Sequence, residues 1–121
     1  MIKLVYCIRR REGMSAEEFR KHWREQHAPR VTQFAKALHA RRYVQSHTLD
    51  SGFNEALRAS RGARTPYDGI TEVWWDSEDD LAAAMKSRDG LEAGRILLED
   101  EGSFIDLQGS SLFLTEEHEI F

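Results

Sequence analysis

Cysteine is almost absent from this sequence, and long hydrophobic runs are missing. Cys7 is the only cysteine, so the chain can form neither an intrachain disulfide nor a cluster of thiolate metal ligands. The short apolar run of residues 2–8 ends in arginines, which is the wrong order for a secretory signal, and it is too short to cross a bilayer. We therefore expect a cytoplasmic protein that does not enter a membrane.

Basic charge is also in short supply. The 17 lysines and arginines are outnumbered by 21 aspartates and glutamates, whereas nucleic-acid binding needs a concentrated basic surface. The sequence has no phosphate-binding glycine loop and no nucleophile elbow. His22 and His27 lie off the i, i+4 spacing of a helical zinc site, and nothing completes a ligand set. We expect no nucleic-acid partner, no cofactor and no metal.

The chain opens with a strand followed by a helix. Residues 2–8 are apolar and rich in β-branched or aromatic side chains, which predicts a strand. Ser15 and Glu18 have the spacing of a capping box, and Met14 and Phe19 that of a hydrophobic staple. These paired signals predict that a helix begins at Ser15.

Pro29 falls in the middle of this helix, whose apolar stripe continues to Leu38. Proline lacks an N–H, and its ring clashes with the carbonyl of the preceding turn. We therefore expect a kink or break between Gln26 and Ala28. His27 then lies on the core-facing stripe, beside backbone carbonyls that have lost their partners.

The rest of the chain alternates strands with a second helix. We expect a strand over 41–49, a long connecting loop over 50–66 and a strand over 67–76. A helix should then run from its N-cap Ser77 to its C-terminal cap Gly102, with an interruption at Asp89–Gly90. A final strand is expected over 107–115. No domain boundary interrupts this series, which indicates a single domain over residues 1–121.

The order β-α-β-β-α-β predicts an α+β ferredoxin-like sandwich, in which two helices cover one face of a four-stranded sheet. The other face would then expose apolar side chains. Packing that face against a second copy of the chain would bury them, so we expect a homodimer.

Four segments, in this order, resemble the EthD domain family of the dimeric α+β barrel superfamily: HWREQHAPRV at 22–31, RRYVQSH at 41–47, YDGITEVWWDS at 67–77 and FLTEEHEIF at 113–121. The resemblance implies a dimeric α+β barrel with a pocket for a small apolar or aromatic molecule. Similar fungal domains decarboxylate or dehydrate aromatic polyketides, and superfamily relatives include cofactor-free oxygenases, cyclases and haem-handling enzymes. Carried over by residue, the resemblance points to His27, with Tyr43, Asp68 and Trp75 as companions.

Each candidate also has a plainer interpretation. His27 is an acid or base in catalysis, or a packed ring bonded to a carbonyl freed by Pro29. Tyr43 and His47 share one strand face, which points to a cavity or to solvent. Asp68 is a ligand contact or a turn residue before Gly69.

The tryptophans are candidate walls for an aromatic-binding pocket. Trp23 lies on the inner stripe of the first helix, and it supplies a large apolar surface. Trp74 and Trp75 are adjacent on a strand, so they point to opposite faces and only one of them can line a given pocket. His118 lies among glutamates in the tail, where solvent or an interface is its simplest environment.

Three functions remain open at this point. The first is a cofactor-independent enzyme that decarboxylates, dehydrates or cyclises an aromatic or apolar carbonyl compound, with His27 as acid or base and Tyr43 stabilising an enolate-like oxygen. In this function Trp23, His47, Asp68 and Trp75 would bind the substrate. The second is a non-catalytic ligand-binding or accessory protein of an oxidase. The third is a structural dimer whose interior is filled.

Overall fold

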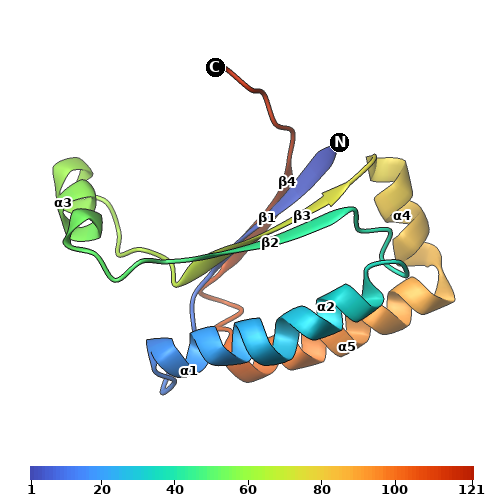
Figure 1. Cartoon of the computed structure of the whole chain (residues 1–121), viewed down its shortest axis with the longest axis horizontal. Helices are drawn as coiled ribbons and strands as arrows, with labels where there is room; N and C mark the ends of the chain where they lie inside the picture. Colours follow the sequence, from blue (N-terminus) through green and yellow to red (C-terminus); the bar gives the residue numbers. More distant parts are fainter.

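A four-stranded antiparallel sheet forms one layer of the protein. The computed structural model describes all residues 1–121. It orders the strands β2–β3–β1–β4, with bounds β1 Ile2–Ile8, β2 Arg42–His47, β3 Gly69–Trp75 and β4 Ser111–Thr115. The long helices lie together against one face of this sheet (Figure 1). The arrangement is the expected ferredoxin-like α+β fold, and β1 has the predicted bounds.

The first helix of the helical layer begins at the predicted capping box. Ser15 accepts a hydrogen bond from the Glu18 N–H, and the Glu18 side chain accepts one from the Ser15 N–H. Helix α1 (Ala16–Lys21) continues into a π-helical segment, η1 (His22–His27), and then into α2 (Ala28–Phe34). Met14 packs against the core cluster that contains Phe19, as the staple predicts.

The disturbance expected between Gln26 and Ala28, a kink or a break, is present in the form of a widened helical turn. The helix widens instead of breaking, because the Ala28 N–H bonds the Trp23 carbonyl five residues back. The wider turn places Pro29 in the first turn of α2, where a residue without an N–H does no harm. A wide turn of this kind is often found at functional sites, and here it carries His27.

The expected loop over 50–66 is also wrong, because it contains helix α3 (Gly52–Arg61). The Ser51 side chain caps its start by accepting a hydrogen bond from the Phe53 N–H, and Gly62 ends it in the left-handed conformation. None of its residues is buried. Figure 1 shows α3 at one end of the sheet, away from the other helices.

The second predicted helix divides into two at Ser87 and not at Asp89–Gly90. The Ser87 backbone is extended, and its hydroxyl accepts a hydrogen bond from the Gly90 N–H, so it ends α4 (Glu78–Lys86) and starts α5 (Arg88–Phe104). Helix α4 has the predicted cap, Ser77. Helix α5 runs past Gly102, which therefore does not cap it, and β4 begins at Ser111 and not at residue 107.

Aromatic side chains hold the helices to the sheet. Trp23 and Phe19 are fully buried, with ring centroids 5.3 Å apart, and Phe104 of α5 packs against Phe19 at 5.7 Å. Gly69 at the start of β3 makes room for the Trp23 ring, because a Cβ there would come within 2.4 Å of it. The Asp-Gly pair therefore has a packing role.

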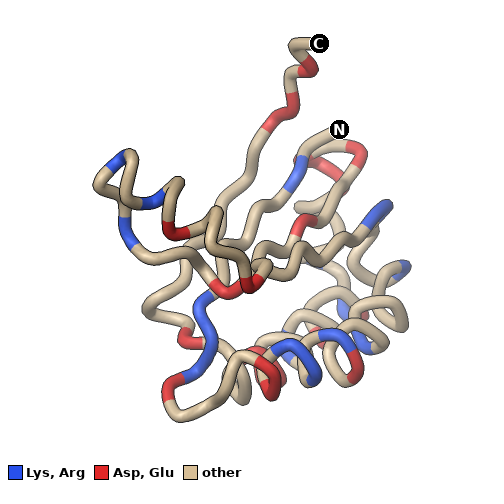
Figure 2. The backbone as a smooth tube through the Cα atoms, turned by 60° about the vertical axis from the view of Figure 1, so that its left-hand side comes forward, with Lys and Arg blue, Asp and Glu red and all other residues tan.

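The opposite face of the sheet carries charged groups beside apolar ones. Lys3 lies 2.7 Å from Glu72, and it also contacts Glu117 of the tail. Val5 and Phe113 are cross-strand partners on this face. Figure 2 shows basic and acidic positions interspersed along the helices, with acidic positions in the C-terminal tail. None of the helices has the length and hydropathy needed to span a bilayer.

Candidate ligand pocket

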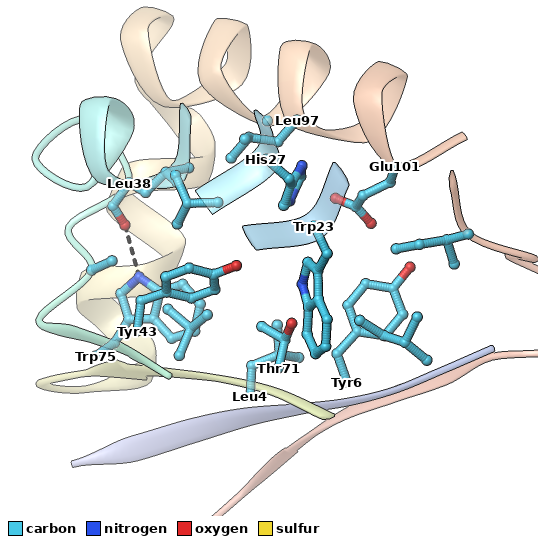
Figure 3. Close-up of a pocket in the computed structure, with 16 residues that line it drawn as sticks. Leu4, Tyr6, Trp23, His27, Leu38, Tyr43, Thr71, Trp75, Leu97 and Glu101 are labelled. Carbon is cyan, nitrogen blue, oxygen red and sulfur yellow. Dashed lines mark hydrogen bonds between the residues drawn. The ribbon is translucent and has the colours of Figure 1, made fainter. Parts of the chain in front are cut away.

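A cavity of about 200 Å³ lies between the inner face of the sheet and the helices η1, α2 and α5. Its wall is mostly apolar, with Leu4 of β1, Val31 of α2 and Leu97 of α5 among the lining side chains (Figure 3). An apolar cavity of ~150 Å³ is enough to hold benzene. This cavity therefore has room for a small ring compound.

His27 forms part of the cavity wall and is only 7% exposed. Its Nδ1 lies 2.7 Å from Oδ2 of Asp100 on α5. Because an ionised carboxylate can only accept a hydrogen bond, Nδ1 carries the ring proton and Nε2 has the free lone pair. Burial lowers the pKa of His27, and the opposing hydrogen bond to Asp100 does not offset it. The ring is therefore a neutral base near pH 7.

Asp100 ties His27 to two further groups. Its other oxygen, Oδ1, lies 3.0 Å from His22 Nε2 and 3.4 Å from Arg30 Nη1. Burial alone would raise the pKa of Asp100, but the hydrogen bonds from His27 and His22 outweigh it and lower the pKa. The result is an ionised carboxylate that fixes the orientation of the His27 ring.

Tyr43 of β2 lines the cavity beside Trp23. Its hydroxyl accepts a hydrogen bond of 2.7 Å from Gln45 Nε2, which also donates to the Trp23 carbonyl at 2.9 Å. Burial raises the pKa of Tyr43. The phenol is therefore protonated at neutral pH.

Two tryptophans are among the residues that line the cavity. Trp23 stands between Tyr43 and Tyr6, and Trp75 lies behind Tyr43, where its Nε1 donates a 2.7 Å hydrogen bond to the Leu38 carbonyl (Figure 3). Of the adjacent pair on β3, Trp75 is thus the one that lines the cavity. Trp74 lies on the other face of the sheet, where its indole donates to Glu117.

His47 and Asp68 lie outside the lining of the cavity. His47 stacks on the far side of Trp23, with ring centroids 4.4 Å apart, and shares a 2.8 Å hydrogen bond with Gln45. Asp68 accepts hydrogen bonds from the backbone and side chain of Arg10 at 2.8 and 2.9 Å. The first supports a wall of the cavity from behind, and the second ties β3 to the end of β1. His118 is exposed beside Glu116.

The sequence patterns did not point to three polar residues of the site: Tyr6, Asp100 and Glu101. Tyr6 and Glu101 both line the cavity, with the Tyr6 hydroxyl beside the Glu101 carboxyl group (Figure 3). Asp100 lies between Leu97 and Phe104 in the series of buried residues of α5. The apolar spacing of this helix could have signalled which members of its acidic run face inward. No group of His, Cys, Asp and Glu side chains has the arrangement of a metal site.

The fold and the cavity define a ferredoxin-like α+β domain with a small apolar pocket between its sheet and its helices. The family model of the EthD domain matches residues 11–108. The chain belongs to the EthD domain family.

Several solved structures share this fold. An EthD family protein from Bacillus halodurans is 22% identical, with 98% of this chain and 99% of that chain covered and a TM-score of 0.65. A dimeric ferredoxin-like protein of unknown function from Thermobifida fusca is 14% identical, with 96% and 90% covered and a TM-score of 0.60. SnoaB, a cofactor-independent oxygenase from Streptomyces nogalater, is 12% identical, with 98% and 93% covered and a TM-score of 0.58. No curated protein matches the chain significantly.

Proposed function

We propose that this protein binds a small apolar or aromatic carbonyl compound in the cavity and catalyses a cofactor-independent proton transfer with His27 as the acid or base. The observation that carries the proposal is the 2.7 Å contact between His27 and the buried Asp100 at the wall of an apolar cavity. A base needs a fixed tautomer and must be unprotonated at the working pH. The Asp100 contact fixes the tautomer, and burial, which lowers the pKa of His27, keeps the ring neutral.

Tyr43 is the second catalytic group in this proposal. A proton removed from the carbon beside a carbonyl leaves negative charge on the carbonyl oxygen. A hydroxyl that already accepts from Gln45 has its own proton available for that oxygen, and a donor in an apolar site stabilises such charge strongly. Trp23 and Trp75 would hold the apolar body of the substrate.

The reaction belongs to the group of decarboxylation, dehydration and cyclisation, each of which begins or ends with such a proton transfer. The shared fold of SnoaB, a cofactor-independent oxygenase, supports chemistry without a cofactor. As part of the same proposal, the protein is a single domain of the cytoplasm, where a free thiol such as Cys7 persists.

We further propose that the protein is a homodimer formed through the outer face of the sheet. Phe113 and Ile70 are 49% and 36% exposed there. Strand alternation also places Val5 and Val44 on that face, opposite the side chains that line the cavity. The fold of a dimeric protein from Thermobifida fusca supports this pairing.

The test is turnover of a panel of aromatic β-keto acids, β-hydroxy ketones and diketones by the wild type and by His27→Ala. We expect one class to be converted by the wild type and turnover to fall by ~10²–10⁴-fold in the variant, while circular dichroism shows that the variant is folded. Turnover that persists unchanged in His27→Ala would exclude His27 as the acid or base.

The second candidate function is ligand binding without catalysis, as an accessory protein of an oxidase. It is favoured by the fact that His27 and Tyr43 already have hydrogen-bond partners within the chain. Saturable binding of aromatic ligands with no turnover of any member of the panel would establish this function.

A further inference from the structure

Glu101 is the one acidic residue among those that line the cavity. It lies one helical turn after Leu97 on α5, and both side chains line the cavity. In Figure 3 its carboxyl group points into the cavity from the same side as His27, with the Tyr6 hydroxyl below it. Its neighbour Asp100 does not line the cavity and instead contacts His27, His22 and Arg30. Adjacent carboxylates of one helix therefore have different roles.

We propose that Glu101 determines which ligands enter the pocket: it limits them to uncharged apolar molecules whose oxygen can meet the Glu101–Tyr6 pair. This inference rests on the proposed binding of a small molecule in the cavity. It names the substrate class that the proposed function leaves open, and it adds a specificity-determining residue to His27 and Tyr43.

When Glu101 is ionised, electrostatics disfavour an anionic ligand. No lysine or arginine is among the residues that line the cavity, so a bound carboxylate would meet the Glu101 carboxylate without a compensating cation. The surrounding wall is apolar, and in such a medium two like charges repel much more strongly than in water. Arg30 does not relieve the repulsion, because it contacts Asp100 outside the lining.

The Glu101–Tyr6 pair offers an uncharged ligand a favourable contact. The Tyr6 hydroxyl lies beside the Glu101 carboxyl group in the cavity (Figure 3). Burial, followed by the charge of Glu101, raises the pKa of Tyr6. Burial and the adjacent Asp100 charge raise the pKa of Glu101, against the opposing influence of the Tyr6 hydroxyl. The ionised carboxylate can accept from a ligand hydroxyl, and the protonated carboxyl can donate to a ligand carbonyl.

This charge at Glu101 favours some of the three proposed reactions, decarboxylation, dehydration and cyclisation, over others. A free β-keto carboxylate would place its charge in the pocket with Glu101. An uncharged ketone avoids that repulsion and still presents to His27 the acidic C–H beside its carbonyl. The substrate class is thus an uncharged ketone that loses water or closes a ring, in preference to an ionised acid that loses carbon dioxide.

The test compares two probes of the same ring and similar size, 2-acetylnaphthalene and 2-naphthoate. Binding is followed by the fluorescence of Trp23 and Trp75 and by NMR shifts of cavity methyl groups. At pH 7.5 we expect the wild type to bind the ketone at least ~10-fold more tightly than the carboxylate. Glu101→Gln should reduce this ratio by at least ~10-fold through tighter binding of the carboxylate.

The matched control is Glu99→Gln, which removes the same charge from the exposed side of α5, where Glu99 contacts Arg95. It should leave the ratio unchanged. Glu101→Met, of similar length, replaces Glu101→Gln if that variant does not fold. A ratio that is equal in wild type and Glu101→Gln, or a wild type that binds both probes equally, overturns the inference.

A pH series adds a second readout. Between pH 8 and 5 the wild type should bind the carboxylate progressively better relative to the ketone, as Glu101 takes up a proton. The groups that face Glu101 are Asp100, Tyr6 and His27, and protonation of His27 acts in the same direction. The part of the response that disappears in Glu101→Gln belongs to Glu101, and a response that is unchanged in the variant contradicts the inference.

The outcomes separate this inference from the proposed function. If neither probe binds the wild type, the proposed binding of a small aromatic molecule fails, and the inference fails with it. If both probes bind without discrimination, only the inference fails. If the ketone is preferred but no ketone is ever turned over, the inference stands and only catalysis is lost.

Discussion

The two faces of the sheet differ in how their polar groups are held, and strand β3 shows the contrast in adjacent residues. On the inner face the Trp75 indole donates to the Leu38 carbonyl and its ring lines the cavity. On the outer face the Trp74 indole donates to the exposed Glu117 carboxylate, and its ring lies beneath the cations of Lys3 and Arg42. Both rings are buried, but the polar partner of Trp75 is a backbone carbonyl, whereas that of Trp74 is an exposed side chain.

The inner face depends on buried partners and the outer face on exposed ones. His27 and Asp100 are both 7% exposed, so a substitution that removes either partner leaves a buried polar group unsatisfied. An ion pair with an exposed member, such as Lys3 with Glu117, is screened by water and contributes ~0–1 kcal/mol. Equivalent substitutions on the two faces should therefore have unequal effects.

The largest difference is expected for the tryptophans. Trp23→Ala removes a fully buried ring that contacts Phe19 and His47, and it should lower the free energy of unfolding by ~3–5 kcal/mol. Trp74→Ala on the outer face should cost less. Urea denaturation of both variants measures the difference, and equal losses would show that the two faces contribute equally to the core.

A substitution on the outer face should instead change the oligomeric state of the protein. Phe113→Glu places a charge among the apolar residues proposed to meet a second copy, so the particle should fall from twice 14.0 kDa to 14.0 kDa. Analytical ultracentrifugation measures the mass. Leu98→Glu is the control, because Leu98 is 57% exposed on α5, and the mass should not change. A wild type of 14.0 kDa would remove the dimer from the proposal.

Asp100→Asn tests the fixed polar groups of the inner face. It removes the charge that holds His27 and His22, and it should cost ~1–3 kcal/mol of stability at pH 7. The pKa of Asp100 is lowered in the folded protein from 3.8, so its contribution is present above that value and is lost as the pH falls through the folded pKa. The difference between variant and wild type should therefore shrink at pH 3.

Glu99→Gln is the matched control for this substitution, because Glu99 is the exposed neighbour of Asp100 on α5. It should change stability little at either pH. A loss in Asp100→Asn no greater than that in Glu99→Gln would mean that the buried carboxylate does not hold the histidines. Urea titrations at pH 7 and pH 3 provide both comparisons.

A smaller effect is expected from the titration of His27. Its pKa is lowered from 6.5 on folding, so the folded state disfavours the proton. The wild type should lose stability as the pH falls below 6.5, until the folded pKa is reached. His27→Gln should lack this part of the pH response, as measured by urea unfolding at pH 7 and pH 5. An identical pH response in both proteins would contradict the lowered pKa.

Local signals explain why much of the fold could be predicted from the sequence. The capping box at Ser15 and the strand over 2–8 depend on neighbouring residues alone, and the structure confirms both. The effect of Pro29 depended on a choice between breaking and widening the helix. The structure has the widened turn, which keeps the helix continuous and Trp23 buried. Such a choice is made by tertiary packing.

The candidate site could be predicted only where a residue stands out by type. Trp23, His27, Tyr43 and Trp75, singled out in the sequence, line the cavity. Asp100 and Glu101 belong to an acidic run in which neighbouring carboxylates look alike. Which of them faces inward depends on the buried face of α5, which the spacing of its apolar residues Ala93, Leu97 and Phe104 indicates.

The smallest effect should come from α3, which belongs to neither face of the sheet. Phe53 is 79% exposed on this helix, whereas Phe19 is fully buried. Phe53→Ser should therefore change the free energy of unfolding by less than ~0.5 kcal/mol, while Phe19→Ser should cost several times more. Urea denaturation compares the two. A loss above ~1 kcal/mol in Phe53→Ser would mean that α3 is covered in solution. If that loss also grew with protein concentration, the covering surface would be a second copy of the chain. The proposed dimer interface would then include α3 as well as the outer face of the sheet.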